Sequence, residues 1–112
     1  MISVCSQMWN FLYLHMRIFA RKTLRDFWIR HSDSEVALRS WFSEAKNSRW
    51  ESPADIKKIY PHASILPENR VVFNIKGNTY RLVVKTNYDY GQVFIRFVGT
   101  HAEYDKIDAT TI

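Results

Sequence analysis

The sequence predicts an α+β domain in which N-terminal helices pack on one face of a small antiparallel β-sheet. Between residues 23 and 47, apolar side chains recur at the three- and four-residue spacing of amphipathic helices. From Arg70 onward the period changes to two, and three strand-like segments follow one another with short turns between them. Helices followed by an antiparallel meander must bury their apolar faces against each other, which is typical of an α+β fold.

The composition indicates one folded domain with an anionic partner. The chain has 112 residues, of which 46% are hydrophobic, enough for a modest core. The 16 Lys and Arg residues against 11 Asp and Glu residues give a net charge of +5. Such a charge favours nucleic acid as the partner, with ordinary solubility as the alternative. The single Cys5 and four scattered histidines match no disulfide framework or zinc site, so we expect no metal and no cofactor.

Residues 1–15 differ from the rest because they contain no Asp, Glu, Lys or Arg. The segment is shorter than the roughly 20 apolar residues that span a bilayer, and it has no signal-peptide pattern. We interpret residues 1–15 as an upstream extension with little structure or function, with Met16 as the candidate start. Residues 16–112 then form a single domain. A membrane anchor at residues 1–15 is the weaker alternative.

The predicted helices follow a short strand at residues 17–20. Thr23 resembles the cap of a first helix, Ser32 the cap of a second that runs to about Asn47, and Ser52 the cap of a short third helix at residues 56–60. Residues 62–69 are expected to form a loop. The predicted buried stripes of the first two helices consist of Leu24, Phe27, Trp28 and His31, and of Leu38, Trp41, Phe42 and Ala45.

The predicted strands cover residues 71–75, 79–85 and 93–98, and strand parity assigns their side chains to two faces. Val93, Ile95 and Phe97 form an apolar row that should pack against the helices. The basic side chains of the last two strands should line the opposite face. One residue of the first strand and one residue of the turn after it should lie beside them. Any one of these residues is ordinarily a solvated outer-face position, but neighbouring basic residues repel one another unless an anion binds. The predicted basic face comprises Arg81, Lys85 and Arg96, joined by Asn74 and Lys76.

The chain leaves the last predicted strand into a cluster of chemically versatile side chains. If a helical turn begins at Thr100 or His101, then His101, Tyr104 and Asp105 fall at i, i+3 and i+4 on one helix face. His101 alone is more often a surface or capping residue, and Tyr104 alone more often packs through its ring. Together with the basic face, the cluster is the candidate place for chemistry.

These segments resemble the HigB family of type II toxin–antitoxin toxins. The resemblance lies in residues 70–75, 78–84 and 95–105, with residues 16–18 and 24–28 similar to that family's start. It implies a RelE-like fold and a ribosome-dependent mRNA endonuclease. It also implies a cognate HigA-type antitoxin with a helix-turn-helix domain, which silences the toxin. Operator DNA would be bound only through the antitoxin complex, and the toxin would act in the cytoplasm with no membrane partner.

For such an enzyme we expect metal-independent cleavage, in which a ribose 2′-OH attacks the adjacent phosphate. Arg81 and Arg96 suit the developing negative charge, because guanidinium groups bind phosphate oxygens bidentately. His101 is the acid or base candidate because imidazole titrates near neutral pH, and Tyr104 could donate a proton or stack on a base.

The remaining predicted RNA contacts are secondary. On the sheet they are Lys76, Lys85 and Asn74, and on the first helix Arg21 and Lys22, which would touch ribosomal RNA. The competing hypothesis is a non-catalytic module that binds RNA or the ribosome through the same face and blocks translation without cleavage.

Overall fold

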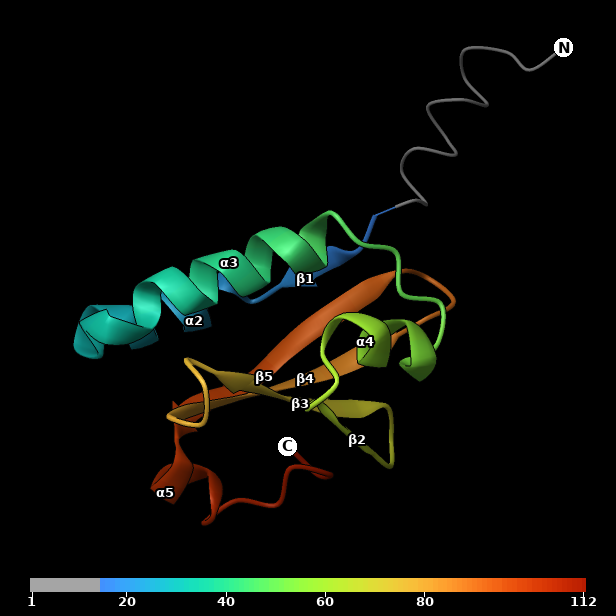
Figure 1. Cartoon of the computed structure of the whole chain (residues 1–112). Helices are drawn as coiled ribbons and strands as arrows, with labels where there is room; N and C mark the ends of the chain where they lie inside the picture. The colour runs from blue at the N-terminus through green and yellow to red at the C-terminus, as the bar shows by residue number, and fades with distance from the viewer. Residues whose placement is uncertain (1–14) are drawn as a thin grey trace, which may run out of the picture.

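The computed structural model describes residues 15–112, and its fold is α+β, as predicted (Figure 1). The predicted extension at residues 1–15 lies outside the described residues except for His15. No helix in the described part of the chain is long and apolar enough to cross a membrane. In chain order the elements are β1 (Arg17–Phe19), α2 (Arg21–Arg30), the 3-10 turn η1 (Ser32–Ser34), α3 (Glu35–Lys46), α4 (Pro53–Ile59), β2 (Ser64–Leu66), β3 (Arg70–Ile75), β4 (Tyr80–Asn87), β5 (Gln92–Thr100) and α5 (His101–Tyr104).

The sheet has five strands in the order β1-β5-β4-β3-β2. The meander β3–β4–β5 is antiparallel as predicted, whereas β1 pairs with β5 in parallel. A hairpin forces antiparallel pairing, but the whole helical layer and the meander separate β1 from β5, so the direction of that edge pair is not fixed by a turn. β2 was not predicted, because its three residues lie beside Pro67 within an otherwise polar loop.

The helical layer lies along one face of the sheet, and α5 with the C-terminal segment lies on the other (Figure 1). The core between helices and sheet confirms most of the predicted stripes. His31 is only half-buried and stacks on the ring of Phe27, and Phe42 is also only partly buried. The fully buried side chains of this core include Leu24, Leu38, Trp41, Ala45, Trp50, Ile56, Val71, Phe73, Leu82, Val84 and Val93.

The first two helices begin at other residues than their sequence caps suggested. α2 starts at Arg21, after Ala20 in the left-handed conformation with φ of 69°, so Thr23 already lies in the first turn. α3 starts at Glu35, because Ser32 opens the separate 3-10 turn η1. Ser34 instead donates its hydroxyl to the carbonyl oxygen of His31 at 2.7 Å. The capping patterns therefore predicted both helices correctly but predicted their first residues two or three positions away from those observed.

Asp33 in η1 ties the helical layer to the turn between β3 and β4. One carboxylate oxygen lies 2.8 Å from Nζ of Lys76, and the other accepts a hydrogen bond from the hydroxyl of buried Tyr80. Lys76 directly follows the last residue of β3 and has φ of 52°, a left-handed conformation that ends the side-chain alternation of the strand. The prediction that Lys76 joins the basic face was wrong, because its ammonium group instead pairs with Asp33 on the helical side.

Replacing Asp33 should make the fold less stable in a pH-dependent way. The hydrogen bonds from Lys76 and Tyr80 lower the pKa of Asp33. A carboxylate with a lowered pKa stabilises the fold above the unfolded-state pKa of about 3.9, and the contribution disappears as pH falls through the folded-state pKa. We expect Asp33→Asn to have a lower Tm than the unmodified chain at pH 7 and a shrinking difference below about pH 4. Thermal unfolding followed by circular dichroism between pH 7 and pH 3 measures this.

Asp26→Asn is the matched control, because Asp26 pairs at 2.9 Å with Lys22 of its own helix, between two exposed side chains. Exposed pairs of this kind contribute little. Equal changes in Tm at pH 7 for the two variants would show that Asp33 does not tie the two parts of the fold together.

Candidate active site

The face of the sheet away from the helices carries three cross-strand rows. Register places Arg81 and Lys85 on this face, as predicted, with Asn74 paired to Arg81. Arg96 lies on the same face, as predicted, because it lines one pocket with Lys85. The middle row is apolar, and each of the two outer rows contains at least one basic residue. The rows are Asn74–Arg81–Gly99, Val72–Val83–Phe97 and Arg70–Lys85–Phe94.

A β-bulge in β5 sets this arrangement. Val84 pairs with Ile95 and Val83 with Phe97, so Arg96 is an extra residue between the two pairs. The extra residue shifts the alternation of side chains by one position from there on. Phe97 therefore faces away from the helices, and the predicted apolar row Val93–Ile95–Phe97 was wrong in its last member. Val98 packs against the helical core instead.

The middle row is covered by the C-terminal segment and does not form an open surface. Its side chains build a second apolar cluster, which we call the apolar ridge. The ridge separates Arg81 from Lys85, whose Cα atoms lie about 13 Å apart, because four strand residues rise roughly 3.3 Å each. The predicted basic face therefore has two parts. The ridge consists of Val72, Val83 and Ala109, with Leu66, Phe97, Tyr104, Ile107 and Ile112 packed against them.

Arg70 holds the end of this covering segment. Its side chain is only 7% exposed. Its guanidinium donates from Nε and Nη2 to the backbone oxygen of Ile112 at 3.1 and 2.5 Å, and from Nη1 to the oxygen of Glu68 at 2.9 Å. A buried charge needs such acceptors. Arg70 was not predicted as part of this face, although its parity with Asn74 placed it there.

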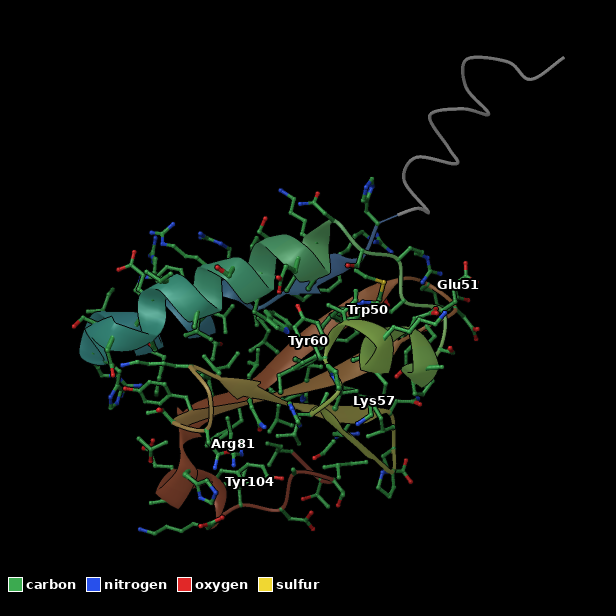
Figure 2. The ribbon with its side chains drawn as sticks, in the orientation of Figure 1. Trp50, Glu51, Lys57, Tyr60, Arg81 and Tyr104 are labelled. Atoms are coloured by element: carbon green, nitrogen blue, oxygen red, sulfur yellow. The ribbon has the colours of Figure 1, made fainter. Side chains whose placement is uncertain are left out.

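Arg81 lies at one end of the face, against the β3–β4 turn. Its Nη2 donates to Oδ1 of Asn78 at 2.6 Å and its Nη1 to the Asn78 carbonyl oxygen at 3.2 Å. These bonds orient the half-buried guanidinium. Figure 2 shows Arg81 and Tyr104 together on the side of the sheet away from α3. Helix α5 packs against both β4 and β5, so Arg81 lies in the same region as the cluster of His101, Tyr104 and Asp105.

Helix α5 confirms the predicted helical turn after β5. Thr100 caps it: its hydroxyl accepts from the Glu103 amide at 3.2 Å, and its own amide donates to Oε1 of Glu103 at 2.8 Å. The bond from the Thr100 amide to the carboxylate lowers the pKa of Glu103. Nδ1 of His101 lies 3.2 Å from Oδ2 of Asp105, and both side chains are exposed. Tyr104 instead packs its ring into the apolar ridge.

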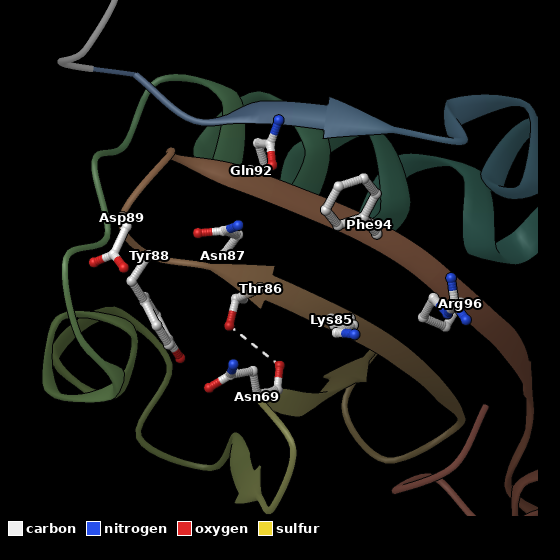
Figure 3. Close-up of a pocket in the computed structure, with 9 residues that line it drawn as sticks. All are labelled: Asn69, Lys85, Thr86, Asn87, Tyr88, Asp89, Gln92, Phe94 and Arg96. Carbon is white, nitrogen blue, oxygen red and sulfur yellow. Dashed lines mark hydrogen bonds between the residues drawn. The ribbon is translucent and has the colours of Figure 1, made fainter.

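The other part of the face is an open pocket of about 670 Å³ beyond the ridge (Figure 3). Lys85 of β4 and Arg96 of β5 line it. Phe94 of β5 also lines it and pairs with Lys85 on one side and with Phe19 of β1 on the other. Its wall near the β4–β5 turn is polar and includes one acidic residue. The pocket is lined by Asn69, Lys85, Thr86, Asn87, Tyr88, Asp89, Gln92, Phe94 and Arg96.

The two helical residues predicted to bind RNA lie in the layer on the opposite side of the sheet. The guanidinium of Arg21 stacks over the ring of Phe42 at 5.1 Å and that of Trp28 at 5.8 Å. Lys22 pairs with Asp26. The structure therefore does not bring Arg21 and Lys22 together with Arg81, and neither does it bring Lys76.

Comparison with known proteins identifies the family. The family model for the HigB toxin, described as the RelE-like toxic component of a toxin–antitoxin system, matches residues 34–107. The chain belongs to the HigB toxin family. It is 25% identical over 96 residues to the mRNA interferase toxin HigB of Escherichia coli K12, which covers 84% of this chain and 92% of that protein. It is 21% identical over 94 residues to the mRNA interferase HigB of E. coli O6:H1, covering 82% and 91%.

In this HigB-family chain, Gly99 leaves the space that Phe97 fills, which gives a test of the bulged register. A Cβ at Gly99 would lie 2.5 Å from Cζ of Phe97 and 3.0 Å from Oε1 of Glu103. We expect Gly99→Ala to displace the ring and the cap of α5 and to lower the free energy of unfolding by about 1–3 kcal/mol. Urea denaturation measures it.

Gly77→Asn is the control, because a Cβ at Gly77 meets nothing within 4 Å and Asn tolerates its left-handed φ of 62°. A Gly99→Ala protein as stable as this control would contradict the position of Phe97 over Gly99.

Proposed function

We propose that this HigB-family toxin is an endoribonuclease that cuts mRNA on the translating ribosome. Its relatives in E. coli carry the name mRNA interferase. The observation that supports the proposal most is the position of Arg81, oriented by Asn78 on the strand against which α5 packs. An oriented guanidinium on β4 and an imidazole on α5, which packs against that strand, supply the two functions that phosphodiester cleavage needs.

The proposed reaction is transesterification within the RNA. The ribose 2′-oxygen forms a bond to the adjacent phosphorus, and the bond from phosphorus to the 5′-oxygen of the next nucleotide breaks. A base takes the proton of the 2′-OH, and an acid gives a proton to the leaving 5′-oxygen. We propose metal-independent chemistry, so the negative charge of the phosphorane falls to arginine side chains.

Within this reaction the residues have separate roles. Arg81 binds the scissile phosphate, and His101, oriented by the carboxylate of Asp105, exchanges protons. Tyr104 contributes its hydroxyl from a ring that the apolar ridge holds in place. Arg96 and Lys85, across the ridge, hold phosphates of the flanking RNA, and Asn74 contacts RNA beside Arg81.

The proposed partners follow from the family. The toxin acts in the cytoplasm, and a HigA-type helix-turn-helix antitoxin neutralises it. Operator DNA is bound only by the antitoxin complex. Arg21 and Lys22 lie on α2, on the helical side of the sheet. We propose that they contact ribosomal RNA, away from the scissile phosphate.

Removing either main catalytic group should reduce mRNA cleavage steeply. We expect Arg81→Ala to lower the cleavage rate by about 10²- to 10³-fold, the usual effect of one lost donor to a developing charge. We expect His101→Ala to lower it by on the order of 10²-fold or more, the usual effect of one lost general acid or base. The measurement is mapping of mRNA ends in translating cells that express each variant under tight control.

Arg25→Ala, an exposed arginine on α2, is the control and should cleave normally. Undiminished cleavage by both Arg81→Ala and His101→Ala would contradict the site. Arrested translation with intact messages in the unmodified protein would favour the non-catalytic binding module.

The 2′-OH mechanism has its own test on programmed ribosomes. After the cleavage site is mapped, an mRNA with 2′-deoxyribose at the nucleotide 5′ of the scissile phosphate should bind but stay uncut, because the nucleophile is gone. The unmodified mRNA should yield a 5′ fragment ending in a 2′,3′-cyclic phosphate. Cutting of the 2′-deoxy message at the same phosphate would rule out 2′-OH attack.

A further inference from the structure

We propose that the pocket beside β1 is a subsite for one nucleotide of single-stranded RNA, whose base stacks on Phe94 and whose phosphates pair with Lys85 and Arg96. This inference rests on the proposed function and extends it. The assigned subsite lies across the apolar ridge from Arg81, on the same face of the sheet.

The aromatic part of the subsite is a stacked pair away from the core. Phe94 pairs across the strands with Phe19, and their rings are 4.9 Å apart and inclined by 15°. The neighbouring pair, Ile18 and Val93, faces the helical core, so the two phenylalanines face the opposite side. Phe19 is 38% exposed and Phe94 is partly exposed, so solvent reaches both rings. Exposed rings beside positive charge are the usual platform for bases of single-stranded nucleic acid.

The charged part of the subsite consists of two exposed cations directed to one pocket. Lys85 lies directly opposite Phe94 in the β4–β5 register. Arg96 is the bulged residue of β5, and bulges beside functional sites commonly redirect a side chain. Within residues 15–112, neither cation has a hydrogen-bond or ion-pair partner. Asp89 at the far wall is the acidic member of the pocket. Two uncompensated cations beside a ring favour an anionic ligand that also has an aromatic part.

The walls of the pocket are fixed by hydrogen bonds, which gives it a stable shape. The hydroxyl of Thr86 donates to the carbonyl oxygen of Asn69 at 3.1 Å, and Oδ1 of Asn87 accepts from the Tyr90 amide at 3.2 Å. The volume of about 670 Å³ lies in the range of small-ligand sites. We infer that an RNA strand bound at Arg81 passes over the C-terminal segment that covers the ridge and places a flanking nucleotide here.

Replacing bases by abasic sites separates stacking from charge. We expect the full-length chain to bind a fluorescein-labelled seven-nucleotide RNA about tenfold more tightly than the matched abasic ribose-phosphate oligomer, by fluorescence anisotropy at fixed salt. Phe94→Leu, which keeps the apolar volume but not the aromatic ring, should abolish that preference. Lys85→Ala and Arg96→Ala should weaken binding of both oligomers alike, because each removes a phosphate contact.

Tyr90→Ala is the control, an exposed aromatic residue that does not line the pocket. It should keep the preference, and each variant is first shown to have the Tm of the unmodified protein. Equal affinity for intact and abasic RNA in the unmodified protein, or a preference retained by Phe94→Leu, overturns the proposal. Loss of antitoxin binding by Phe94→Leu with an unchanged base preference would assign the pocket to a protein partner and likewise overturn it.

The subsite and the cleavage proposal can fail separately. Arg81→Ala should lose cleavage and keep the base preference, because Arg81 lies across the ridge. A base preference without cleavage by the unmodified protein would leave the subsite standing and refute the enzyme. Cleavage without a base preference would do the reverse.

Discussion

Between the pairs Val84–Ile95 and Val83–Phe97, β5 carries one residue more than β4. This extra residue turns Phe97 to the outer face, where the C-terminal segment covers it together with Val83. Gly99 makes room for the ring, and Arg70 binds the end of the covering segment. The division of the outer face into two basic parts depends on this one irregularity, because a regular strand would have placed Phe97 against the helices.

The two parts of the outer face carry separate roles in the proposed function. At one end, the turn that carries Asn78 orients Arg81, and Asp33 anchors that turn to the helical layer. At the other end, Arg96 and Lys85 meet an aromatic pair. The apolar ridge between them is packed under the C-terminal segment. In the proposed function, this separation places the contacts to flanking RNA apart from the residues proposed to cut it.

The sequence predicted correctly those features that interactions between neighbouring residues determine. Most of the helix stripes, the strand parity up to Ile95 and the turn at His101 depend on neighbours a few residues away, and the structure confirms them. The bulge at Arg96, the pairing of β2, the burial of Arg70 and the contact of Lys76 with Asp33 depend on distant segments. None of these has a signature in one sequence. The candidate site was therefore predicted as a surface, and its division was not.

The most direct test of a cleavage centre at Arg81 is a cryo-electron microscopy structure of the toxin on a ribosome with mRNA blocked at the 2′-position. We expect a phosphate of the mRNA to lie against the guanidinium of Arg81, with His101 beside the adjoining ribose. An mRNA that contacts the helical layer, or passes the sheet without reaching Arg81, would contradict it.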